Sequence, residues 1–244
     1  MNQALLRDCK MYVGAYDLSG DMNAHNLDYK ADVKDITVFN NTSHKRLGGI
    51  KTVMSKHEGV WQAGVGLVDD ALFNNLGLAN VPITVCPTTG AVGEPCYSFD
   101  ALQADYAPAL KMDDALRFSV SAEGSDGQNL VRCTVMHNGA EIATGNGSII
   151  QLGAVTSLQN LFGWLHVLAE SGTSSPTLNV IVQSAATGGF GSPTTRITFN
   201  AATGIGYQSA NPVAGPITDQ YWCVSWTISG STPSFTFVVS LGIQ

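Results

Sequence analysis

Apolar and polar residues alternate along much of this chain, and the alternation predicts strands. Residues 34–39, KDITVF, alternate with β-branched side chains, and residues 49–61, GIKTVMSKHEGVW, repeat the pattern. The segment between them is rich in asparagine and glycine, which favour turns. We therefore predict a long hairpin over residues 34–61.

The first strand of this hairpin has two distinguishable faces. Since successive side chains of a strand point to opposite faces, Ile36 and Val38 share one face and are predicted to point inward. The opposite face then carries Asp35, Thr37 and Phe39. A monomer gains little from an outward phenylalanine, whereas an interface would bury it.

Further strand signals follow. Residues 116–124 and 130–139 predict a second pair of strands, joined by the turn sequence GSDGQN. In the last third, four segments bounded by Gly, Pro, Ser or Thr predict the strands of an antiparallel sandwich: residues 177–185, 194–202, 221–230 and 234–243. Residues 158–172 fit either a helix or a buried pair of strands, and this setting favours the strands.

One short helix is predicted near residues 69–76. Asp69 or Asp70 can cap its N-terminus, and Gly77 is suited to end it. Three apolar side chains share one face of this helix: Leu72, Phe73 and Leu76.

Charge is distributed unevenly, and this divides the chain. Residues 1–150 hold 11 of the 12 Lys and Arg residues and 17 of the 19 Asp and Glu residues. This shift predicts two domains, residues 1–152 and 153–244. The expected fold is all-β, with two antiparallel β-sandwich or barrel domains, the first carrying the short helix and the long hairpin.

Composition excludes several classes of protein. The net charge of −7 argues against a protein that coats nucleic-acid phosphates. No uninterrupted apolar stretch is long enough for a transmembrane helix, and Arg7, Asp8 and Lys10 stand where a signal peptide needs an apolar core. The five cysteines lack the spacing of a metal site, so we expect small buried residues in a protein made in a reducing cytosol.

No catalytic constellation is found. His57 and Glu58 resemble the start of a zinc-protease motif, but Trp61 stands where the second histidine belongs. The five histidines are dispersed, and helix capping and turn chemistry account for the paired acids Asp69–Asp70 and Asp113–Asp114. We predict a non-enzymatic protein with no metal and no cofactor.

An aromatic row near the C-terminus has two interpretations. Trp222 and Trp226 lie four residues apart, so both point to the same face of a strand, with Cys223 opposite. With Tyr221 they could form a platform on which a sugar stacks. Burial of the pair in a sandwich core is favoured, because the neighbouring strands are equally apolar.

The order of elements resembles a known family. Residues 11–39, MYVGAYDLSGDMNAHNLDYKADVKDITVF, are followed by LGGIKTVMSKHEGVW, the helical DDALFNNLG and then YSFDALQADYAPALKMDDALRFSVSAEG. Over roughly residues 10–150 this pattern of short motifs resembles the tail tube proteins of long-tailed bacteriophages. Residues 216–243, PITDQYWCVSWTISGSTPSFTFVVSLGI, resemble the β-sandwich that is appended to some phage virion proteins.

The resemblance implies a structural role in a virion. Tail tube proteins form hexameric rings in which the long hairpin contacts neighbouring copies, and DNA passes through the stacked rings without specific binding. The implied partners are therefore copies of this chain and other virion proteins, with no membrane. The candidate interface residues lie in the hairpin: Asp32, Asp35, Phe39, His44, Lys45, Arg46 and Lys51.

Two other functions stay open at this point. The same sandwiches could bridge capsomers as a capsid decoration protein. The aromatic row Tyr221, Trp222 and Trp226 could instead belong to a carbohydrate-binding module on the virion.

Overall fold

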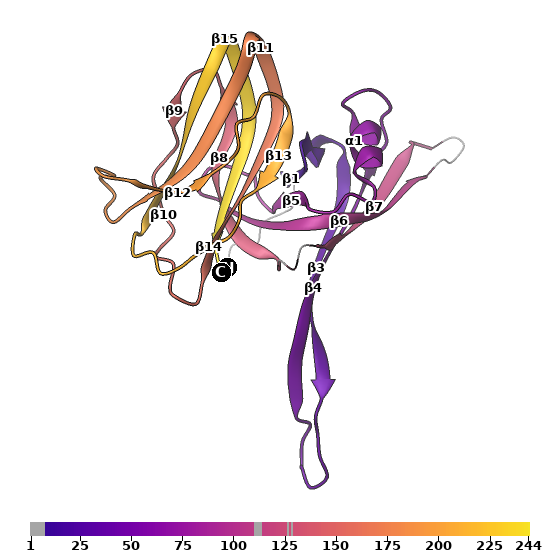
Figure 1. The fold of residues 1–244 in the computed structure, drawn as a ribbon. Helices are drawn as coiled ribbons and strands as arrows, with labels where there is room; N and C mark the ends of the chain where they lie inside the picture. The colour runs from indigo at the N-terminus through magenta and orange to yellow at the C-terminus, as the bar shows by residue number, and fades with distance from the viewer. Residues whose placement is uncertain (1–7, 110–113, 126, 128) are drawn as a thin grey trace. The chain divides into compact units, whose positions relative to one another are not determined.

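The computed structural model describes residues 8–109, 114–125, 127 and 129–244. Within them the chain forms strands joined by turns, one α-helix and one 3-10 turn (Figure 1). The ladders between the strands are antiparallel. The predicted all-β class is confirmed.

Two compact units divide the chain. The first comprises residues up to Gly20, Pro82–Ser98 and Val131–Gln244, and the second comprises Asp21–Val81 and Phe99–Leu130. The predicted division at residue 152 differs from these units. Its basis was a local shift in composition, whereas the first unit is held together by pairing between distant segments, such as Phe235 of its last strand with Glu141.

The first unit contains most of the strands. They are β1 (Lys10–Val13), β2 (Tyr16–Asp17), β5 (Val81–Cys86), β8 (Val131–Glu141), β9 (Gly145–Asn146), β10 (Ile150–Gln151), β11 (Asn160–Ala185), β12 (Thr194–Thr198), β13 (Gly206–Ser209), β14 (Val213–Ala214) and β15 (Tyr221–Ile243), with the 3-10 turn η1 (Leu18–Gly20). The strand β6 (Pro95–Ala109) supplies Pro95–Ser98 to this unit and its other residues to the second, and the first residue of β5, Val81, also belongs to the second.

Two long strands dominate the first unit. β11 and β15 pair from Leu161↔Ile243 to Ala185↔Tyr221, and Figure 1 shows them side by side. The register shifts around Thr173, and Gly172 and Gly230 adopt positive φ angles of 137° and 114° at this corner. Glycine suits both positions because L side chains rarely adopt such angles. Three of the four strands predicted in the last third, together with most of the ambiguous segment 158–172, thus belong to two long, bent strands, whereas the fourth, residues 194–202, forms the separate strand β12.

Both halves of each long strand face one core. Because successive side chains of a strand point to opposite faces, every second residue of these strands reaches this core. The buried residues they supply are Leu161, Leu165, Val167, Leu178, Val180, Val182, Trp222, Val224, Trp226, Phe235, Phe237, Val239 and Leu241. Each such side chain contributes about 1.5–3 kcal/mol to folding when fully buried. The first unit is therefore stabilised by its own core.

A chain of buried polar groups crosses the first unit. His166 Nδ1 lies 2.6 Å from the carbonyl oxygen of Gly14, so this nitrogen carries the proton and donates. The other ring nitrogen then accepts from the Thr84 hydroxyl at 2.8 Å. Ser98 donates to Thr84 and accepts from Ser240, at 3.0 and 2.8 Å. Burial lowers the pKa of His166 to about 4, which keeps the ring neutral and the chain of bonds intact.

The second unit is a small sheet with a helix. Its strands follow the order β3 (Met22–Asp35), β4 (Arg46–Val60), β7 (Arg117–Gly124) and β6. The helix α1 (Val68–Asn75) lies where the sequence predicted it. Gln103 of β6 holds it, since its Nε2 donates to the carbonyl oxygen of Leu72 at 2.6 Å.

Details of α1 differ from the prediction. The N-cap residue is Leu67, and Asp69 and Asp70 lie in the first turn. Asp69 is engaged elsewhere, because Trp61 Nε1 donates to it at 2.9 Å. Of the predicted apolar face only Leu72 is buried, because Val68 takes the other inward position. Two members of that predicted face point to solvent, Phe73 and Leu76.

The predicted pair formed by residues 116–124 and 130–139 is wrong. Both segments are strands, β7 and β8, but β7 pairs with β4 and β6, whereas β8 pairs with β6 and β15. Alternation predicts a strand without naming its partner, so the nearest strand in sequence was assumed. The turn-forming Asp113 lies outside the described residues.

Candidate assembly interface

The long hairpin extends beyond the sheet that supports it. β4 pairs with β7 from Val60 back to Met54, and the rest of β4 pairs with β3 alone among the described strands. We call residues 29–53, which form this two-stranded extension and its tip, the arm. Figure 1 shows β3 and β4 continuing together past β7 to the tip. The predicted hairpin is confirmed, although its first strand begins earlier, at Met22, and ends at Asp35.

The arm exposes apolar side chains on both of its faces. A sheet with one buried face alternates between buried and exposed residues, as β4 does from Val53 onward. In the part of the arm beyond Val53 this alternation stops, and six apolar side chains are exposed: Val33, Ile36, Val38, Phe39, Leu47 and Ile50. Phe39 is fully exposed, at 103%. A surface of this kind is typical of a protein interaction site.

The prediction that Ile36 and Val38 point inward is therefore wrong. Ile36 and Val38 are 42% and 67% exposed, because both lie in the tip beyond the end of β3. The alternating pattern correctly indicated an extended conformation. It could not show that a single copy has no surface against which these two side chains pack.

Some of the predicted interface residues build the tip itself. The carboxylate of Asp35 accepts hydrogen bonds from the Thr37 backbone N–H and from His44 Nδ1, both at 2.9 Å. The bonds from Thr37 and, more weakly, the bond from His44 lower the pKa of Asp35. Lys45 donates its backbone N–H to the Thr37 hydroxyl at 2.9 Å, and Arg46 faces Asp35 in the ladder. These contacts give the tip a defined shape.

Other predicted residues lie along the arm. Asp32 lies 4.0 Å from Lys34, and Lys51 lies 5.8 Å from the centre of the Tyr29 ring. Phe39 projects from the tip. The structure thus brings Asp35, His44 and Lys45 together and leaves the charged groups of the arm near solvent, where they remain available to a neighbour.

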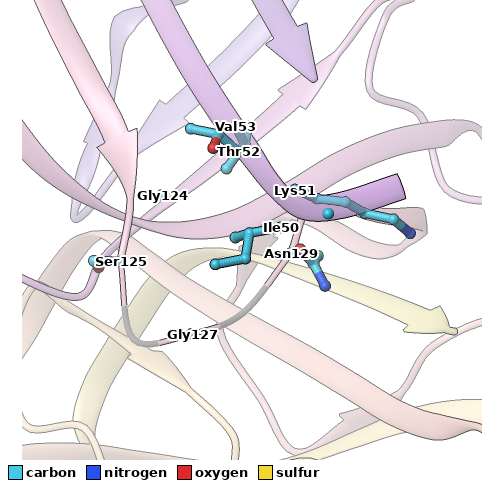
Figure 2. Close-up of a pocket in the computed structure, with 9 residues that line it drawn as sticks. Ile50, Lys51, Thr52, Val53, Gly124, Ser125, Gly127 and Asn129 are labelled. Atoms are coloured by element: carbon cyan, nitrogen blue, oxygen red, sulfur yellow. The ribbon is translucent and has the colours of Figure 1, made fainter. Parts of the chain in front are cut away.

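A hollow lies along the unpaired edge of β4. It has a volume of about 540 Å³, and Gly49–Val53 form one wall. Figure 2 shows that Ser125 and Asn129, which also line it, come from the segment that follows β7. Of the described residues that line it, Lys51 alone carries a charge. An open backbone edge beside such a groove suits an added extended segment, since unpaired N–H and C=O groups can continue the ladder.

Sequence reasoning did not find this edge. Two apolar side chains on the second strand, Leu47 and Ile50, are 59% and 80% exposed. A signal for them was present, because the apolar positions of the hairpin occur on both faces of its strands near the tip. The local pattern could not show at which residue the pairing between β4 and β7 ends.

The aromatic row lies in the core of the first unit. Trp222 and Trp226 are 0% and 5% exposed, and their indole N–H groups donate to the carbonyl oxygens of Gly153 and Ala143 at 2.9 and 3.0 Å. Neither ring face is open to solvent, so these two tryptophans offer no platform for a sugar. Tyr221 is half-buried.

The described residues show neither a metal site nor a disulfide. Among the described residues no three His, Cys, Asp or Glu side chains converge in a way that could hold a metal ion. All five cysteines are unpaired thiols, and four of them are buried. In the described part of the chain, no helix has the length and apolar character needed to cross a bilayer.

Comparisons with known proteins give structural likenesses only. No protein-family model matches the chain, and no curated protein matches it. A chain from the virion of a native gene transfer agent particle is 11% identical, with a TM-score of 0.40, over 50% of this chain and 93% of that one. The SPP1 Dit protein, described as a hub of the adsorption apparatus in phages that infect Gram-positive bacteria, is 9% identical.

The likeness to SPP1 Dit covers 98% of this chain and 100% of that one, with a TM-score of 0.36. A chain of the phage p2 baseplate in its activated conformation is 10% identical, with a TM-score of 0.34, over 95% of this chain and 97% of that one. At these scores the likenesses carry no argument about function.

Proposed function

We propose that this protein is a structural subunit of a phage virion, which assembles with its own copies into rings of a tail tube. The observation that carries the proposal is the arm: a long hairpin with open backbone edges and exposed apolar side chains on both faces. Its natural partner is a neighbouring copy, with the other virion proteins joining the assembled rings.

Pairing between copies would explain both features of the arm. Exposed strand edges are templates for adding another strand, and soluble proteins usually cover or interrupt them. Here β3 is accompanied by β4 alone among the described strands, and β4 is open from Arg46 to Val53. A neighbour's strand would complete this edge and bury side chains such as Ile50.

Charge is consistent with passage of DNA. The net charge of −7 supplies no general attraction to phosphates, so DNA can move through a ring without being held. Assembly would thus provide a passage and no binding site. The resemblance in the sequence to tail tube proteins agrees with this role. The structural likenesses occur in related kinds of particle, but the proposal does not rest on them.

Electron microscopy and light scattering test the proposal. We expect the purified protein to form rings or tubes as its concentration rises. Ile50→Glu should raise the concentration needed for assembly, because it places a charge on the open edge where Ile50 is 80% exposed. The matched control is Leu158→Glu, since Leu158 is 94% exposed in the first unit.

Other outcomes would contradict a tail tube role. A protein that stays monomeric at high concentration, even with other virion proteins present, would exclude ring formation. Particles that bind empty capsids as small knobs would instead indicate capsid decoration. If Ile50→Glu assembles at the same concentration as the wild-type protein, the open edge of β4 is not part of the interface.

A further inference from the structure

The outer surface of α1 and the loops beside it carry exposed apolar side chains. Val65 is 99% exposed and Phe73 is 63% exposed, and two leucines near the end of the helix, Leu76 and Leu78, are 45% and 47% exposed. We call these four residues the α1 patch. In one copy they remain uncovered by the described residues of the second unit, the arm included.

The α1 patch rests on a rigid support. Val68 and Leu72 bury the inner face of the helix. At its C-terminal end, Gly77 donates its backbone N–H to the carbonyl oxygen of Gln103 at 3.0 Å. Phe73 also contacts the edge of the Tyr106 ring, with the ring centres 6.4 Å apart and the planes at 78°. Because the support is fixed, the exposed faces are presented in a defined orientation.

The stretch of sequence that holds the patch has acidic side chains and no lysine or arginine. No lysine or arginine occurs between residues 57 and 110, whereas Asp69 and Asp70 lie in the first turn of α1. Asp69 is 2.9 Å from the indole nitrogen of Trp61, and Asp70 accepts from the backbone N–H of Gly66 at 2.9 Å. Both of these hydrogen-bond partners are uncharged, so neither forms an ion pair with a carboxylate.

The arm carries the opposite sign. Within the arm five basic residues, Lys30, Lys34, Lys45, Arg46 and Lys51, outnumber the two acidic residues, Asp32 and Asp35. The tip adds the exposed side chains of Val38 and Phe39 to Lys45 and Arg46. Tip and patch are therefore complementary in charge, and both offer uncovered apolar surface.

From this complementarity we propose that the arm tip of one copy docks on the α1 patch of the next copy. Phe39 and Val38 would pack on Phe73 and Leu76, while Lys45 and Arg46 would face the first turn of α1. The contact joins two different surfaces, so it propagates from copy to copy and can close a ring. This inference rests on the proposed function and names the receiving surface within it.

Cysteine cross-linking tests the contact directly. The background is Cys9→Ser, which removes the one cysteine that is not buried. Phe39→Cys and Phe73→Cys proteins are prepared separately, mixed at a concentration where rings form and oxidised. We expect disulfide-linked dimers in the mixture, since a disulfide requires Cα atoms within roughly 7 Å. Phe39→Cys mixed with Ile205→Cys is the control, because Ile205 is 66% exposed in the first unit.

A second variant separates this inference from the proposed function. Phe73→Asp should raise the concentration for half-maximal assembly by at least about tenfold, as expected for a central interface aromatic. Its melting temperature should stay near that of the wild type, because the side chain is largely exposed.

Rings that form without a Phe39–Phe73 cross-link, and that tolerate Phe73→Asp, would overturn the inference and leave ring formation standing. Failure of the wild-type protein to form rings under any condition would overturn both. A cross-link in the mixture together with weakened assembly of Phe73→Asp would support both.

Discussion

Met54 of β4 pairs with Glu123 of β7, and this is the last pair of the ladder between these two strands. Beyond it, β4 and β3 continue as a two-stranded ribbon to the tip. A two-stranded ribbon is marginally stable in water unless something packs on it. The end of the ladder with β7 therefore divides the hairpin into a base supported by a third strand and an arm in which β3 and β4 pair only with each other among the described strands.

Shortening the arm should separate assembly from folding. We expect replacement of residues 36–45 by Asn-Gly, between the paired Asp35 and Arg46, to abolish rings. The melting temperature should change by no more than about 2 °C, because every side chain in that segment is exposed. Light scattering and thermal unfolding followed by circular dichroism measure the two effects. Rings of wild-type size from the shortened protein would contradict the proposed role of the tip.

The two core tryptophans should contribute to stability rather than to binding. Trp222→Ala should destabilise the protein by about 3–5 kcal/mol, because it leaves a cavity and an unpaired carbonyl at Gly153. Trp222→Phe retains most of the volume and should cost about 1–3 kcal/mol. Urea unfolding gives both values. A loss below 1 kcal/mol for the alanine variant would show that Trp222 does not fill the core.

Acid should destabilise the second unit through His57. Burial, with a smaller effect of nearby His25, lowers the pKa of His57 to about 3. Between the ordinary value near 6.5 and this value the unfolded chain binds the proton and the folded protein does not. The free energy of unfolding should therefore fall as pH decreases from 6.5, by up to about 1.4 kcal/mol per pH unit from this residue.

His57→Leu should reduce that acid dependence. Both ring nitrogens of His57 are buried without a hydrogen-bond partner among the described residues, so the substitution removes no bond. Urea unfolding at pH 6.5, 5.5 and 4.5 measures the change. An equal slope in wild type and variant would mean that His57 takes up its proton in the folded state within this range.

The thiols should differ sharply in reactivity. A hydrogen bond with Cys96, followed by burial, raises the pKa of Cys86, and Cys96 pairs directly with Cys133 in the ladder. Because a thiolate is the reactive form, these groups should not react with Ellman's reagent at pH 8 in the native protein. We expect at most one fast thiol, absent in Cys9→Ser, and all five in guanidine. Rapid labelling of two or more thiols in the native state would contradict the buried positions.

Local pattern was sufficient for the types of element. The alternation over residues 49–61 predicted β4, and the sequence VDDALFNNLG predicted α1 near its observed position. The charged hairpin was also predicted, and with it the candidate interface residues, whose part in an interface remains a proposal. These features depend on a few neighbouring residues, whose spacing decides which side chains share a face.

Which strands pair with each other, and where each ladder ends, depended on contacts between segments far apart in the sequence. Nothing in residues 130–139 indicates that β8 pairs with β15, about a hundred residues later in the chain. In the same way, the local sequence does not indicate that Ile150 pairs with Trp222. The same holds for the arm: its apolar residues were visible in the sequence, but their exposure follows from where β7 ends. The sequence by itself determined the strands and the helix, because dihedral preference and side-chain period are local. Only the tertiary structure decided which surfaces were covered, because burial depends on segments far apart in the chain.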